Sequence, residues 1–139
     1  MKQSLKPFFG ILLIAAVVAG FILVPKVLRA NEVAPWTSDY AAAKQQAATQ
    51  HKLVLLYFTA TWCGPCQEMK HTTFADREVE RAITAKLVPV KLDVDENRPL
   101  AQQFGIESIP NFKIIDGEGR VLKEQAGYMT SAEFLAWIK

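Results

Sequence analysis

Both cysteines of this 139-residue chain lie in one stretch, Trp62-Cys63-Gly64-Pro65-Cys66, where an apolar run gives way to a helical pattern. With Cys63 at the helix start, the free N–H groups and the dipole of the first turn should stabilise a thiolate there and lower its pKa. Cys66 lies one turn deeper, so the two sulfurs can close a disulfide and open it again by exchange. The pattern demands a strand that ends directly before a helix, and it predicts a thiol–disulfide exchange site.

Two other uses of such a cysteine pair are disfavoured. Zinc usually needs four ligands, and the chain has no second cysteine pair. His71 would share a helix with Cys66, and His51 precedes the strand, so neither completes a ligand set, and we expect no metal. A purely structural disulfide would constrain the unfolded chain little, because its loop is so short.

The first 30 residues differ from the rest. Residues 8–24 form an unbroken apolar run of 17 residues, at the short limit for spanning a bilayer and longer than a usual signal-peptide core. Cleavage after Ala30 would place Leu28 where a small residue is preferred. We therefore expect residues 1–30 to form an uncleaved signal anchor, with a removed signal peptide as the alternative.

Charge supports this division. Residues 1–30 carry four of the 16 basic side chains and no acidic one, which leaves 12 basic against 14 acidic side chains in the remainder. The basic excess thus belongs to the N-terminal segment, and no nucleic-acid-binding surface is indicated. Lys2 and Lys6 favour an N-terminus inside the cytoplasm and a domain outside it.

After a linker at residues 31–36, strands alternate with helices until a hairpin and a last helix. Strands are expected at residues 53–58, 87–93, 111–115 and 120–125. Helices are expected at residues 39–50 (capped by Thr37 or Ser38), 63–71, 77–86 (capped by Asp76), 97–104 and after a capping box at Thr130–Glu133. Pro89 suggests an edge position or an irregularity in the second strand. The pattern predicts an α/β fold with a central mixed sheet flanked by helices.

Further segments carry a family resemblance: WCGPC at 62–66, KLDVDEN with Lys91 and Asp95, FGIESIP at 104–110, and Gly127. With them, residues 36–139 resemble the thioredoxin superfamily, which implies a thioredoxin-like domain at residues 37–139. Within it the chain is most similar to the periplasmic C-terminal domain of the membrane reductase DsbD and to similar anchored proteins. The segments behind this narrower likeness are Trp36, Asp39-Tyr40 and Thr73–Asp76 with the helix after it.

The resemblance implies roles for residues near the cysteines. The Ile109–Pro110 bond would be cis and lie beside the sulfurs, leaving the Ile109 backbone free to pair with an extended substrate segment. The substrate-binding rim would consist of Trp62, Ile109 and Gly127. Support for the catalytic Cys63 and Cys66 would come from Trp62, Gly64, Pro65, Lys91 and Pro110.

The chain departs from the family at one position. Thioredoxins usually carry a buried aspartate six residues before the first cysteine, where it helps to transfer the proton of the resolving thiol, and Tyr57 stands there. A phenol with an ordinary pKa of about 10 is a poor base, so we interpret Tyr57 as a core residue. Proton transfer would then use Lys91, Glu68 or water.

The leading hypothesis is a membrane-tethered disulfide reductase acting on protein thiols and disulfides. Gly64-Pro65 resembles the pair in reducing thioredoxins, whereas oxidising relatives usually carry a histidine before the second cysteine. No cofactor beyond the Cys63–Cys66 pair is expected, but electrons must come from a membrane donor of the DsbD type. The resemblance implies a bacterial inner membrane with the domain in the periplasm, or a secreted periplasmic protein. Alternatives are an extracytoplasmic thiol oxidase or isomerase, or a redox-inactive binding or chaperone module.

Overall fold

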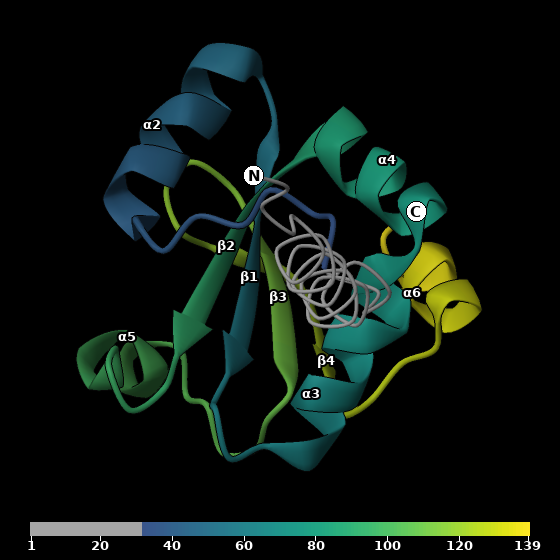
Figure 1. Ribbon diagram of the computed structural model, residues 1–139. Coiled ribbons are helices and arrows are strands. Elements are labelled where there is room, and N and C mark those ends of the chain that lie inside the picture. Colours follow the sequence, from purple (N-terminus) through teal and green to yellow (C-terminus); the bar gives the residue numbers. More distant parts are fainter. Residues whose placement is uncertain (1–31) are drawn as a thin grey trace, which may run out of the picture. The chain divides into compact units, whose positions relative to one another are not determined.

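A mixed four-stranded sheet forms the centre of residues 32–139, the part of the chain that the computed structural model describes (Figure 1). The strands are β1 (Leu53–Thr59), β2 (Leu87–Asp93), β3 (Asn111–Ile115) and β4 (Val121–Ala126). Their order is β2-β1-β3-β4, with β1 and β2 parallel and the other two pairs antiparallel. The predicted signal anchor lies outside the described residues, and within them no helix is long and apolar enough to cross a membrane.

Helices cover both faces of this sheet (Figure 1). One face carries α2 (Tyr40–Gln50) and α5 (Arg98–Gln103). The other face carries α3 (Gly64–His71), the short 3₁₀ helix η1 (Thr73–Ala75), α4 (Arg77–Lys86) and α6 (Ser131–Trp137). The predicted α/β arrangement of a mixed sheet between helices is confirmed.

The central strand β1 is buried on both faces, which explains its unbroken apolar run. Its alternate residues Val54, Leu56 and Phe58 pack in the cluster under α2 and α5, while Leu55 and Tyr57 pack under α3 and α6. On the α3 side the core is rich in aromatic rings, which pack at offset or edge-on angles. This packed face fixes the position of α3, whose first turn carries the cysteines.

Several local signals set the element boundaries as predicted. The Asp76 side chain accepts a hydrogen bond from the Glu78 N–H at the start of α4. Thr130 and Glu133 form the reciprocal capping box of α6. Pro89 lies in β2 at the edge of the four-stranded sheet, where a missing N–H is tolerated.

The predicted cap of α2 is wrong. The N-cap is Asp39, not Thr37 or Ser38, because the Asp39 Oδ1 accepts the Ala42 N–H at 2.9 Å. Thr37 instead forms a parallel bridge with Val90 on β2. A residue engaged in strand pairing cannot also begin the helix.

The segment before α2 is attached to the domain. The Thr37 N–H donates to the Pro89 carbonyl at 3.1 Å, and the Lys91 N–H donates to the Thr37 carbonyl at 2.8 Å. Earlier in the chain, the Val33 N–H donates to the Phe74 carbonyl at 2.9 Å. Val33, which the sequence places in a linker, therefore contacts η1, and Thr37, at the start of the predicted domain, pairs with β2.

Candidate active site

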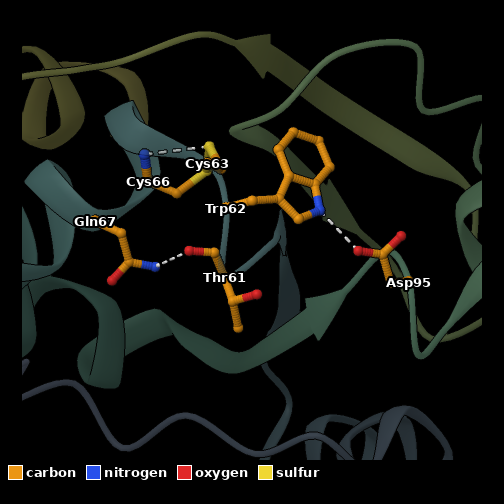
Figure 2. Close-up of a disulfide and its surroundings, with 6 residues drawn as sticks. All are labelled: Thr61, Trp62, Cys63, Cys66, Gln67 and Asp95. Atoms are coloured by element: carbon orange, nitrogen blue, oxygen red, sulfur yellow. Dashed lines mark hydrogen bonds between the residues drawn. A yellow bond between two sulfur atoms is a disulfide. The ribbon is translucent and has the colours of Figure 1, made fainter.

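The two cysteines lie where the loop after β1 enters α3 (Figure 2). Cys63 is the N-cap residue of α3, and a disulfide joins it to Cys66, with their Cα atoms 5.3 Å apart. The Cys66 N–H donates to the Cys63 Sγ at 3.3 Å. Pro65 fits the first turn because its missing N–H would have no partner within the helix. The Cys63 sulfur thus occupies the position where the helix N-terminus stabilises negative charge.

The connection from β1 to α3 is short and held by its own hydrogen bonds. The Cys63 N–H donates to the Ala60 carbonyl at 3.2 Å. The Gln67 side chain reaches back to the Thr61 carbonyl at 3.5 Å (Figure 2). Met69 is fully buried and fixes the helix against the sheet. The cysteines are therefore positioned by packed elements on both sides.

Exposure differs sharply among the motif residues. Cys63 is 4% exposed and Cys66 is 1% exposed, whereas Trp62 is 68% exposed. The Trp62 indole N–H donates at 2.8 Å to the Oδ2 of Asp95, which lies in the turn after β2 (Figure 2). This hydrogen bond holds an exposed ring beside the disulfide. Asp95 belongs to a segment that carries the family resemblance, but its pairing with Trp62 was not predicted.

An apolar hollow of about 320 Å³ lies beside this tryptophan. Its lining consists of Trp62, Val94, Ala101, Ile106, Glu107, Ser108 and Ile109. The structure thus brings together Trp62 and Ile109, two of the three residues predicted to contact substrate. A hollow of this composition fits an apolar side chain of a partner protein.

The bond between residues 109 and 110 is cis, as expected, and two further predicted residues, Pro110 and Gly127, lie at it. Gly127 does not line the hollow; its N–H donates to the Pro110 carbonyl at 2.8 Å. Gly127 has φ +93°, a conformation that other residues rarely adopt. Gly64 and Pro65 are exposed in the first turn of α3, and Pro110 is buried.

Lys91, the other predicted supporting residue, is paired with a residue that the sequence did not single out. Its Nζ lies 2.7 Å from the Glu32 Oε2 and 5.9 Å from the centre of the Tyr57 ring. Glu32 and Lys91 are 59 residues apart, and no motif marks Glu32. The family resemblance at Lys91 was the only sequence signal for this ion pair, and it did not indicate Glu32 as the partner of Lys91.

Tyr57 is buried between aromatic rings, as its interpretation as a core residue requires. Its ring stacks on Phe112 at 4.8 Å with an angle of 15° between planes. Burial raises the pKa of Tyr57 to about 12; the Glu32 carboxylate adds to the rise, and a hydrogen bond with Thr59 opposes it. The phenol therefore stays protonated at neutral pH. Glu68, the other suggested proton carrier, is exposed on α3.

Among residues 32–139, no group of three or more histidine, cysteine, aspartate or glutamate side chains is arranged to hold a metal ion.

The fold and the site together define a thiol–disulfide oxidoreductase, with a redox pair at a strand-to-helix junction beside an apolar hollow. Residues 40–139 match the thioredoxin-like domain family, and the chain belongs to this family. It is 40% identical over 92 residues to thioredoxin of Alicyclobacillus acidocaldarius, covering 66% of this chain and 84% of that protein.

The chain is also similar to DsbD proteins. It is 31% identical over 101 residues to the thiol:disulfide interchange protein DsbD of Colwellia psychrerythraea, covering 68% of this chain but 17% of that protein. The crystal structure of the oxidised C-terminal domain of Neisseria meningitidis DsbD superposes with a TM-score of 0.62 at 27% identity. That superposition covers 73% of this chain and 95% of the DsbD domain.

Proposed function

We propose that this protein reduces disulfides in other proteins, with Cys63 as the attacking sulfur and Cys66 as the resolving one. The observation that carries this proposal is the bonded cysteine pair at the start of α3, directly beside the exposed Trp62 and its apolar hollow. Cys63 is the more exposed of the two cysteines and lies at the helix N-terminus. An incoming disulfide would therefore meet Cys63 first.

The reaction transfers two electrons by two exchanges. The Cys63 thiolate attacks one sulfur of the substrate disulfide, forming a mixed disulfide and releasing the first substrate thiolate. The Cys66 thiol then loses its proton and attacks the Cys63 Sγ, which releases the second substrate thiolate and forms the Cys63–Cys66 disulfide. The substrate gains two electrons and two protons, and the protein is oxidised. In this scheme the cysteine pair itself is the redox centre and no further cofactor takes part.

The residues between the cysteines favour the reducing direction. A positive side chain next to a thiolate stabilises the reduced form and makes the pair more oxidising. Gly64 and Pro65 carry no charge, and the hydrogen bond that the Cys63 Sγ accepts comes from the Cys66 backbone N–H. Neither intervening residue therefore stabilises the reduced cysteine pair. The absence of such stabilisation is what a reductant requires.

We further propose that the domain works outside the cytoplasm, tethered by residues 1–30 to a bacterial inner membrane. The support is the apolar run at residues 8–24 with its flanking basic residues, and the similarity to DsbD. Once oxidised, the pair must be reduced again, which calls for a thiol donor. A membrane electron donor of the DsbD type would supply those electrons.

The first experiment is the reduction potential of the full chain, equilibrated with glutathione redox buffers. A value near the thioredoxin range of about −270 mV supports a reductant, whereas a value near about −120 mV would make the protein an oxidant. The Cys66→Ser variant should accumulate as a mixed disulfide with protein clients through Cys63. Full function in a variant with both cysteines replaced by serine would overturn the exchange mechanism and favour a binding module.

A further inference from the structure

We propose that Glu32 accepts the proton of the Cys66 thiol when Cys66 resolves the mixed disulfide. This inference rests on the exchange function proposed above. The thiolate, not the thiol, is the attacking species, so the Cys66 proton must leave before the second exchange. Cys66 is only 1% exposed, so bulk water has little direct access to that proton. A proton acceptor within the protein would remove this obstacle.

The register of the sheet brings the Glu32–Lys91 pair to the same face as the cysteines. Tyr57 on β1 and Lys91 on β2 are direct partners in the parallel ladder, so their side chains point to the same face. Tyr57 belongs to the buried cluster that also contains Cys63 and Cys66. The Lys91 ammonium lies over the Tyr57 ring and binds Glu32. The carboxylate thus lies on the side of the sheet that α3 covers.

The Glu32 carboxylate has an unused acceptor. Its side chain is 13% exposed, and its Oε2 lies 2.7 Å from the Lys91 Nζ. The other oxygen, Oε1, is buried and accepts no hydrogen bond from the residues that the structure describes. An unpaired buried carboxylate oxygen is costly, and it is also free to take a proton.

A cavity of about 400 Å³, lined mainly by polar residues, extends from Lys91, the partner of Glu32, to residues on either side of the cysteines. Lys91 forms part of its wall, together with Ala60 and Thr61 of the loop before Cys63 and Gln67, which follows Cys66. The cavity is large enough and polar enough to hold several water molecules, which can carry a proton between groups that do not touch. The other titratable groups at this place are Tyr57 beneath the pair and Lys70, Asp93 and Glu96 in the cavity wall.

The neighbouring groups are less suitable. The pKa of Tyr57 is about 12 because of burial, so its phenol holds its own proton. The Lys91 ammonium has donors but no lone pair. Glu68 is exposed on α3 rather than facing the buried cluster. Asp93 and Glu96 also carry carboxylates in the cavity wall, but the Asp93 Oδ1 already accepts the Asp95 N–H and Glu96 is exposed. Glu32, whose Oε1 is buried and unpaired, is therefore the acceptor that the geometry favours.

Protons and electrons balance in this step. The S–H bond of Cys66 breaks and its proton passes through intervening water to the Glu32 carboxylate. The Cys66 electron pair forms the bond to the Cys63 Sγ, and the bond between Cys63 and the substrate sulfur breaks. The leaving substrate thiolate takes a proton from solvent, and Glu32 returns its own proton to solvent.

A single-turnover reaction of the reduced full chain with glutathione disulfide tests this assignment. Acid quenching, alkylation and mass spectrometry count the chains that carry glutathione on Cys63, so attack and resolution are measured separately. In Glu32→Gln, attack by Cys63 should stay within about twofold of the parent, while resolution slows by about tenfold or more and the mixed disulfide accumulates. Raising the pH should narrow this gap, because hydroxide can then remove the Cys66 proton without Glu32.

Two further variants separate proton transfer from a structural role. The amide introduced by Glu32→Gln keeps an oxygen that can accept a hydrogen bond from Lys91. If the role of Glu32 were only structural, the rate of resolution in this variant would therefore change little. Glu32→Asp keeps the carboxylate and should recover part of the rate. Glu118→Gln, in an exposed turn with 74% of that side chain accessible, should resolve like the parent.

Each result bears on a different claim. Resolution in Glu32→Gln as fast as in the parent overturns the role of Glu32 and leaves the exchange function intact. Equal slowing of attack and resolution also overturns it, because a proton acceptor for Cys66 acts on the second step alone. Failure of the parent chain to react with glutathione disulfide would overturn both this inference and the proposed function.

Discussion

Replacement of Tyr57 by phenylalanine distinguishes a core side chain from a proton-transfer group. Tyr57 stacks on Phe112 and packs against Trp36 and Phe74, and a phenylalanine ring keeps these contacts. Only the hydroxyl and its hydrogen bond with Thr59 are lost. One neutral hydrogen bond contributes about 1 kcal/mol, so we expect the free energy of unfolding to fall by about that amount.

The exchange rate should hardly change in this variant. With a pKa of about 12, only about one Tyr57 in 10⁵ is ionised at pH 7, too few to serve as a base. Reaction of the reduced Tyr57→Phe chain with glutathione disulfide should therefore proceed within about twofold of the parent. A loss of about tenfold, equivalent to about 1.4 kcal/mol of barrier, in a folded variant would refute this reasoning.

The same pKa predicts a difference in stability at high pH. An unfolded tyrosine loses its proton near pH 10, whereas the buried Tyr57 keeps it to about pH 12. Between these values the native state binds a proton that the unfolded state has released, so stability falls as pH rises. A shift of about two pKa units corresponds to about 2.7 kcal/mol, a loss that Tyr57→Phe avoids. In urea unfolding, the parent should lose its advantage over the variant between pH 10 and 12; a constant difference would contradict the buried, neutral phenol.

Three other changes test separate features. Glu124→Gln removes the carboxylate 2.7 Å from the buried Lys113 ammonium; because Glu124 is half exposed, we expect a loss of about 1 kcal/mol in urea unfolding at pH 7. The hydrogen bond from Lys113 lowers the pKa of Glu124, so this contribution should disappear as pH falls below the ordinary glutamate value, and a difference that persists in acid would contradict it. Thr130→Ala removes the capping box of α6 and should lower stability by about 1 kcal/mol, or the Tm by about 4–8 °C, without changing exchange with glutathione disulfide. Asp95→Ala removes the hydrogen bond that holds the Trp62 ring. It should raise KM for a protein disulfide by about fivefold, while the reaction with glutathione disulfide stays unchanged. Equal effects on both substrates would mean that Asp95 acts on the cysteines themselves.

Features that depend on neighbouring residues were predictable from the sequence. The run at 53–58 predicted a strand buried on both faces, and β1 extends it by one residue to Thr59. Asp76 and the Thr130–Glu133 box were readable because a cap bonds to residues two or three positions away. The helix expected from residue 63 begins one residue later, at Gly64, because Cys63 is its N-cap.

Features that depend on pairing between distant segments were not predictable in this way. The cap of α2 could not be chosen among Thr37, Ser38 and Asp39, because the bridge that occupies Thr37 comes from β2. The contact between Trp62 and Asp95 joins two loops 33 residues apart. Each of these contacts requires the sheet register, which periodicity alone does not give.

Glu32 shows most clearly what sequence likeness omits. The family match begins at residue 40 and the predicted domain at residue 37, so neither includes the carboxylate that pairs with Lys91. Yet Val33 bonds to η1, and Thr37 pairs with β2 on both sides of Val90, which fixes the chain close to that carboxylate. If Glu32 accepts the Cys66 proton as proposed, part of the redox machinery lies between the predicted anchor and the family domain. A chain shortened to residues 40–139 would then keep both cysteines but would resolve mixed disulfides more slowly than the full chain.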